Sequence, residues 1–112
     1  MQRTYHPTLR IGVTANADLA YKYRFVDVAG NYASAGEQAI GILETPVEDE
    51  DLATVVCEGT CLIEASAAIA AGAQIGAATS GKAVTYSSGQ RLGFALNAAT
   101  ADGDLIEMKL SL

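Results

Sequence analysis

The sequence predicts an all-β fold, either a compact β-sandwich or a small barrel, and three observations lead to it. Apolar and polar side chains alternate with a period of two in several segments, as in half-buried strands. Turn-forming residues separate these segments at short intervals, which gives roughly seven or eight short strands. The chain also has 11 Gly, 5 Tyr, 2 Phe and no Trp, and this composition favours short strands and tight turns over long helices.

Residues 1–17 are expected to form an extended N-terminal arm, followed by a single β domain over residues 18–112. The arm carries Tyr5, His6 and Leu9 without a partner strand close in sequence. An ordinary edge strand with a frayed end is the alternative, because chain termini are often disordered unless they are tied down. The length of 112 residues suits one domain with one core.

Within the domain, alternation predicts strands at residues 21–25, 39–45, 55–65, 92–96 and 106–112. Gly59 lies inside the long central strand and predicts a bulge or kink there. The turn-rich connection around Asp102 and Gly103 predicts that the last two strands form an antiparallel pair. One short helical turn is expected at residues 66–71, because a Ser can cap it, Ala favours helix and a Gly follows.

The charge balance excludes several kinds of partner. The net charge is -6, and the 7 basic residues are scattered, whereas affinity for nucleic acid depends on clustered Lys and Arg.

No segment approaches the roughly 20 apolar residues of a membrane-spanning helix, and residues 1–10 lack the apolar stretch of a signal peptide. Two cysteines fit a reducing compartment better than a disulfide framework, so we expect the chain to be made in a cytosol.

No catalytic residue, metal site or cofactor is expected, and the chain is predicted not to be an enzyme. A structural zinc site needs about four Cys or His ligands, whereas the chain offers Cys57, Cys61 and one His. On one extended strand the two cysteine Cα atoms would lie about 13 Å apart, so buried free thiols are expected instead of a disulfide. His6 lacks a nucleophile and an orienting acid around it. The acidic residues 48–51 lack the spacing of a calcium loop and are expected to form a solvated turn.

Several short motifs occur in order between residues 20 and 112. They are Ala35-Gly36-Glu37 before a strand, Glu58-Gly59 inside the central strand, Ile69-Ala70-Ala71-Gly72-Ala73-Gln74-Ile75-Gly76, Gly81-Lys82-Ala83-Val84, Arg91-Leu92-Gly93-Phe94-Ala95-Leu96, and Asp102-Gly103-Asp104 before the terminal strand. In this order and spacing, the motifs resemble those of the small capsid decoration (cement) proteins of tailed bacteriophages. Residues 1–18 depart from the family pattern, since they are longer and more aromatic than its short polar start.

The resemblance implies a compact β-sandwich or β-tulip-like domain, usually a homotrimer, on the outside of the capsid. It implies a structural protein of the virion, assembled in the host cytoplasm, that stabilises the shell by clamping neighbouring subunits of the major capsid protein. A small carbohydrate- or ligand-binding β module is the alternative, in which Tyr21, Tyr23, Tyr32 and Tyr86 would stack on a sugar. The lack of Trp and of an acidic-aromatic cluster argues against that alternative.

The residues expected to bind the capsid lie in the arm, and they are Arg3, Tyr5, His6, Leu9 and Arg10. Arg and aromatic side chains are the types that dominate interface hot spots. An acidic chain gains little from an acidic shell, so its basic arm is the part best suited to contact carboxylates there.

Overall fold

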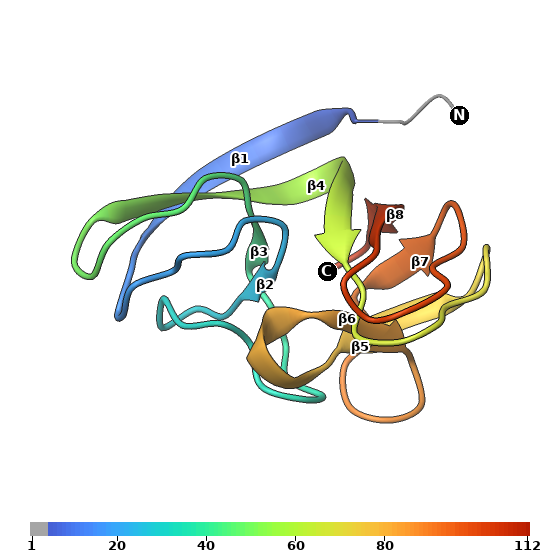
Figure 1. Ribbon diagram of the computed structural model, residues 1–112. Coiled ribbons are helices and arrows are strands. Elements are labelled where there is room, and N and C mark those ends of the chain that lie inside the picture. Colours follow the sequence, from blue (N-terminus) through green and yellow to red (C-terminus); the bar gives the residue numbers. More distant parts are fainter. Residues whose placement is uncertain (1–4) are drawn as a thin grey trace.

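Strand β4 organises the sheet, because three other strands pair with it along its length. The computed structural model describes residues 5–112, in which β4 (Leu52–Glu64) pairs antiparallel with β1 (Pro7–Thr14), β3 (Gly41–Leu43) and β8 (Leu105–Leu110) (Figure 1). The other elements of these residues are β2 (Phe25–Val26), β5 (Gln74–Ala77), β6 (Ala83–Thr85), β7 (Gly93–Ala95) and the 3-10 helix η1 (Thr79–Gly81). The prediction of an all-β fold is confirmed.

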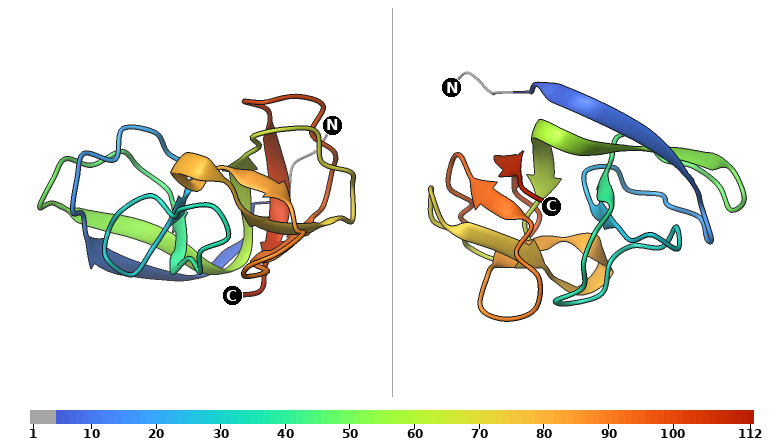
Figure 2. Two further views of the ribbon diagram at one scale, coloured as in Figure 1. Left: turned by 90° about the horizontal axis from the view of Figure 1, so that it is seen from below. Right: turned by 180° about the vertical axis from the view of Figure 1, so that it is seen from behind.

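The eight strands form one antiparallel sheet that curls into a nearly closed barrel (Figure 2). Their order is β2-β3-β4-β8-β7-β5-β6, and β1 pairs with β4 along the edge opposite β3. The pairing of β7 with β8 confirms the expected C-terminal pair. An isolated parallel bridge joins Ala65 to Ala83, and the Ser66 amide donates a hydrogen bond to the Ala83 carbonyl at 2.8 Å. This bridge brings β6 beside the end of β4, so the strands β4, β8, β7, β5 and β6 nearly close into a barrel.

A bend at Gly59 divides β4 into two halves. The first half pairs with β1 and β3, and the second half pairs with β8. Gly59 has a φ of 95°, and the pairing with β1 is irregular between residues 56 and 59. The predicted bulge or kink at Gly59 is therefore confirmed.

The bend lets β4 contribute to two hydrophobic cores. Within residues 5–112 the barrel core holds 18 buried residues, among them Phe25, Ile42, Ile63 and Met108. The minor core is smaller and consists of Ala15, Leu19, Val26, Leu43, Ala53 and Val55. The single core expected from chain length is thus divided into two, which lie on opposite sides of the sheet formed by β3 and the first half of β4.

The side of β4 that faces the barrel core changes across Gly59. Val56 faces that core before the bend and Cys61 faces it after the bend, although one number is even and the other odd. One extra residue in a bulge has this effect, because it shifts the alternation of side chains by one. Simple alternation along residues 55–65 would put Val55, Cys57 and Cys61 on one side, but the bulge places Val55 and Cys57 at the minor core and Cys61 in the barrel core.

Two further expectations differ from the structure. Residues 66–71 form no helical turn, because Ile69 exchanges two backbone hydrogen bonds with Ala99 and is buried in the barrel core. The short helical turn lies instead at η1. Residues 21–24 are not a strand, since Tyr23 has a φ of 67° and turns the chain before β2. The described residues contain no helix that is long and apolar enough to cross a membrane.

Part of the expected arm is a strand of the sheet. Residues 7–14 form β1 and pair with β4, a partner strand that is far from them in sequence. Ile11 and Val13 pack at the minor core, and this burial explains why the pairing forms. The edge strand was the alternative that the sequence left open.

Replacing Gly59 by Ala should destabilise the protein more than replacing Gly72. Both glycines have positive φ, but a Cβ at Gly59 would lie 2.2 Å from the His6 carbonyl oxygen, whereas a Cβ at Gly72 meets nothing within 4 Å. The Gly72→Ala variant should lose about 1 to 2 kcal/mol of unfolding free energy from backbone strain alone. The Gly59→Ala variant should lose roughly 3 kcal/mol or more, because the start of β1 must also move. Urea unfolding measures both, and equal losses would show that the contact with His6 is unimportant.

Candidate functional site

The residues expected to bind a partner lie at the start of β1. Arg3 lies outside the described residues, whereas Tyr5, His6, Leu9 and Arg10 are all at the surface. The Tyr5 hydroxyl donates a hydrogen bond to Glu44 Oε2 at 2.6 Å, and Arg10 Nε donates to Glu44 Oε1 at 2.7 Å. Glu44 thus gathers two of the expected contact residues and holds them against the end of β3.

The electrostatics of this group keep it together near neutral pH. Burial would raise the pKa of Glu44, but the hydrogen bonds from Arg10 and Tyr5 outweigh it and hold the pKa below its ordinary value. Burial, together with the hydrogen bond to Glu44, raises the pKa of Tyr5. The Glu44 carboxylate therefore stays charged to a more acidic pH than is usual for Glu, and the Tyr5 hydroxyl stays protonated to a more alkaline pH than is usual for Tyr. Tyr5 and Arg10 are consequently anchored within the protein.

His6 and Leu9 are the expected residues that remain most available to a partner. The His6 backbone is fixed, because its amide donates to Thr60 Oγ1 at 2.8 Å and its carbonyl accepts from the Thr60 amide at 3.1 Å. Leu9 is 43% exposed although it is apolar. It borders an open groove of about 770 Å³, whose walls come from β1, β4, β8 and the residues before β3: Thr8, Leu9, Ile11, Ala39, Ile40, Cys57, Glu58, Gly59, Lys109, Leu110, Ser111 and Leu112. This side of β1 thus offers an apolar contact surface.

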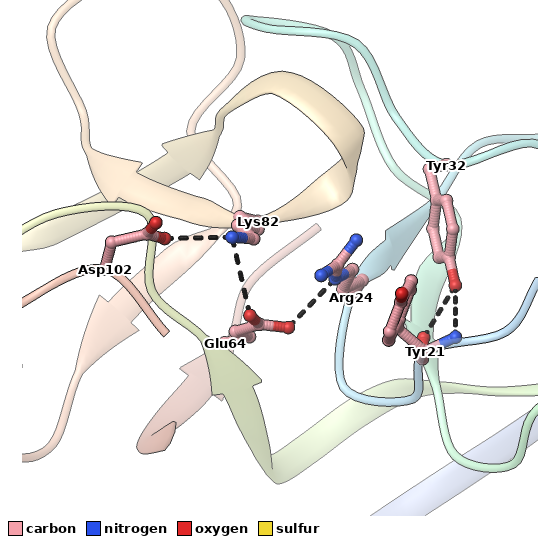
Figure 3. Close-up of polar contacts among 6 residues, drawn as sticks. All are labelled: Tyr21, Arg24, Tyr32, Glu64, Lys82 and Asp102. Carbon is pink, nitrogen blue, oxygen red and sulfur yellow. Dashed lines mark hydrogen bonds and ion pairs between the residues drawn. The ribbon is translucent and has the colours of Figure 1, made fainter. Parts of the chain in front are cut away.

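A second group of polar side chains forms an ion-pair network where β4 ends (Figure 3). Arg24 Nε lies 2.9 Å from Glu64 Oε1, and Lys82 Nζ lies 3.5 Å from Glu64 Oε2 and 2.9 Å from Asp102 Oδ1. The Arg24 and Glu64 side chains are only 12% and 18% exposed. The network joins the end of β4 to the residues just before β2 and β6. Removing one partner of a largely buried pair leaves an uncompensated charge, so these pairs help to hold the three strands together.

The same network fixes an exposed aromatic side chain. The Arg24 guanidinium lies 4.4 Å from the centre of the Tyr21 ring and 5.6 Å from that of Tyr32. The Tyr32 hydroxyl accepts a hydrogen bond from the Tyr21 amide and donates one to the Tyr21 carbonyl, each at 2.8 Å. Tyr21 is nevertheless 60% exposed and, with Tyr23 and Glu64, lines an open cleft of about 500 Å³. Of the four tyrosines considered for sugar binding, Tyr86 belongs elsewhere, near Gly76.

Local sequence patterns do not reveal this network. Its members are separated by up to 78 positions, from Arg24 to Asp102, and each looks like an ordinary surface charge. The one local signal is the alternation of Tyr and basic residues at positions 21–24, and that alternation also predicts a strand. The tertiary fold alone brings Glu64 and Lys82 to Arg24.

The two cysteines lie in different surroundings. Cys57 is half-buried at the minor core, Cys61 is buried in the barrel core, and both are free thiols. Burial raises the pKa of Cys61 to about 12, and burial also raises the pKa of Cys57. No group of three or more His, Cys, Asp or Glu side chains within residues 5–112 is placed to hold a metal ion.

Comparisons with known proteins identify a protein family and a similar solved structure. The model of a family described as phage cement protein matches residues 3–110. Among solved structures, the chain is similar to the "head fiber gp8.5 N base" of bacteriophage phi29, with a TM-score of 0.75 and 18% sequence identity over 92% of this chain and 93% of that one. No curated protein sequence matches the chain. The likeness to the solved structure establishes a shared fold.

We predict that neither thiol reacts quickly in the folded protein at neutral pH. A thiolate is the reactive form, and the raised pKa values of Cys57 and Cys61 keep both groups protonated. Ellman's reagent should therefore titrate both thiols promptly in guanidinium chloride but slowly in native buffer, with Cys61 the slower. Replacing Cys61 by Ala should cost roughly 1 to 3 kcal/mol of stability through lost packing. Prompt reaction of Cys61 in the native protein, or stoichiometric zinc on elemental analysis, would contradict the prediction.

Proposed function

The chain belongs to the phage cement protein family, and from this we propose that it is a structural protein of the virion that binds the outside of a phage capsid. It would stabilise the shell by holding neighbouring subunits of the major capsid protein together, without catalytic activity or a cofactor. The single observation that carries the proposal is the family match over residues 3–110 of a chain of 112. The fold shared with a protein described as the base of a head fiber supports a place on the phage head.

Clamping needs a rigid body that makes several contacts at once. Each contact then raises the effective concentration of the next, so modest single affinities give tight overall binding. Two buried cores and the ion-pair network of Arg24, Glu64, Lys82 and Asp102 provide such a body. We also propose that the protein assembles onto capsids in the host cytoplasm and does not bind nucleic acid, in line with its net charge of -6.

The proposed contact with the capsid lies along β1 and the residues before it, in the segment 1–17. Within the described residues β1 pairs only with β4, so the backbone groups of its other edge have no strand partner. A segment of the capsid protein can add to such an edge by backbone hydrogen bonds, while side chains in a nearby groove give specificity. Leu9 and the groove beside it supply the side-chain contacts that would give specificity. His6 is exposed next to them, and Arg3 belongs to the same proposed contact.

The carbohydrate-binding alternative also has one observation in its favour. Tyr21 is held in place by Arg24 and Tyr32 while most of its ring remains exposed, and a rigid exposed ring is suited to stacking on a sugar. Glu64, the acidic side chain of the same cleft, is already paired with both Arg24 and Lys82, so it has little capacity to bind sugar hydroxyls. The capsid proposal is therefore preferred.

Replacing Leu9 by Asp should weaken binding to capsids by more than tenfold, that is by more than about 1.4 kcal/mol, because it puts a charge into an apolar contact. Co-sedimentation with capsids from a phage that lacks this gene measures the affinity. Val28→Asp is the control, since Val28 is 79% exposed and lies in the turn after β2. Deleting residues 2–11 is a poorer test: it removes half of β1 and should lower the melting temperature markedly, not slightly as an unpaired arm would.

Equal binding of the two variants would remove Leu9 from the contact. No binding by the wild-type protein would overturn the capsid proposal. In that event, glycan-array binding that is lost on Tyr21→Ala would favour the carbohydrate alternative.

We further predict that the protein is a homotrimer. Many residues of the barrel core are small, including Ala33, Ala65, Ala83 and Ala95, so burial of apolar surface between copies would add stability that a shallow core lacks. Native mass spectrometry should show a species of three times the 11.6 kDa chain mass. A monomer at micromolar concentration, together with single copies on capsids, would contradict this prediction.

A further inference from the structure

A buried carboxylate lies on the outer side of the sheet, away from both cores. Glu107 in β8 is 4% exposed, whereas its neighbours Ile106 and Met108 point into the barrel core. Side chains alternate along a strand, so Glu107 must point to the opposite side. Its Oε1 atom is buried and has no hydrogen-bond partner among the described residues.

The surroundings of Glu107 are apolar and partly exposed. Pairing places Leu62 of β4 opposite Glu107 on one side, and the hydrogen bond from the Leu96 amide to the Glu107 carbonyl places Leu96 opposite it on the other. Leu105 lies two residues away on the same side of β8. Leu96 and Phe94 are each 38% exposed, and Leu105 is 36% exposed. We call this surface the Glu107 face, made of Leu62, Phe94, Leu96, Leu105 and Glu107.

No other group within residues 5–112 satisfies the free carboxylate oxygen. Lys109 lies two residues along the same side and is exposed, but none of the ion pairs among the described residues joins it to Glu107. Asn97 Oδ1 accepts a hydrogen bond from the Glu107 amide at 2.9 Å, and this fixes the backbone at Glu107. An unpaired buried carboxylate destabilises a protein, and a donor from a partner removes that cost.

We propose that the Glu107 face is a second contact with the capsid, and that it receives a basic side chain of the major capsid protein set among apolar residues. This proposal rests on the proposed function. The carboxylate supplies charge complementarity, and the surrounding leucines exclude water from the pair that forms, which is the arrangement of an interface hot spot. None of the five residues of the Glu107 face lines the groove beside Leu9, so the two proposed contacts are made by different side chains. Two separate contacts are what a clamp between neighbouring subunits requires.

The charges of this chain favour a different protein over a second copy as the occupant. The chain has 13 acidic and 7 basic residues. Three of the basic residues, Arg10, Arg24 and Lys82, are already in ion pairs. A second copy is therefore mainly negative overall, although one of its cations, Lys109, lies on the same side of β8 as Glu107.

The test is a comparison of Glu107→Gln with wild type in co-sedimentation with capsids that lack this protein. Gln keeps the shape of the side chain and removes the charge, so affinity should fall at least tenfold and its dependence on salt should weaken. The melting temperature should stay the same or rise, because the buried unpaired charge is gone. Glu48→Gln, in an exposed turn, is the control for overall charge and should bind as wild type does. Leu96→Asp is the second variant, and it should also lose binding while the protein stays folded.

Each other result has a distinct meaning. If wild type binds capsids and both Glu107→Gln and Leu96→Asp bind equally well, the Glu107 face is not a contact, although the proposed function stands. If wild type does not bind capsids, the proposed function and this inference both fail. A change of oligomer mass in Glu107→Gln with unchanged capsid affinity assigns the face to a second copy and overturns the inference. A large fall in the melting temperature of Glu107→Gln shows that the carboxylate has a partner within the chain, and this result also overturns the inference.

Discussion

The bend of β4 at Gly59 is the constraint on which the rest of the structure depends. A strand of 13 residues serves both parts of the sheet, and the change of facing side between Val56 and Cys61 lets it contribute to two cores. A straight strand would keep the same alternation along its whole length. Because the His6 carbonyl lies against Gly59, the residue that bends β4 also determines how closely β1 can approach.

The ion-pair network is a consequence of this bend. After β4 turns, its last residue, Glu64, lies between Arg24, just before β2, and Lys82, just before β6. The network therefore links segments on either side of the barrel closure, and through Arg24 it also fixes Tyr21. A body held in this way keeps its exposed surfaces at constant separation. That property suits a protein that must contact neighbouring capsid subunits simultaneously, because less conformational freedom is lost on binding.

The candidate contact residues could be selected from the sequence by type but not by role. Tyr5 and Arg10 belong to the types found at interfaces, yet both are held by Glu44, which is 39 positions from Tyr5 and has no local signal to mark it. Leu9 stays exposed because it lies where the β1–β4 pairing is irregular. Glu107 falls on the polar side of the alternation, as expected, but its burial depends on Leu62 and Leu96 from two other strands.

The sequence by itself determined the all-β class, the bulge at Gly59, the β7–β8 pair and, through its motifs, the family. These features depend on local periodicity and on backbone conformations that few residues other than Gly adopt, so neighbouring residues suffice to predict them. Only the tertiary structure decided that residues 7–14 pair with β4, that residues 66–71 form no helical turn, and that two cores form. Each of these depends on which distant strand supplies backbone partners and apolar cover, and the burial gained there outweighs local preferences such as the helical tendency of the alanines after Ser66.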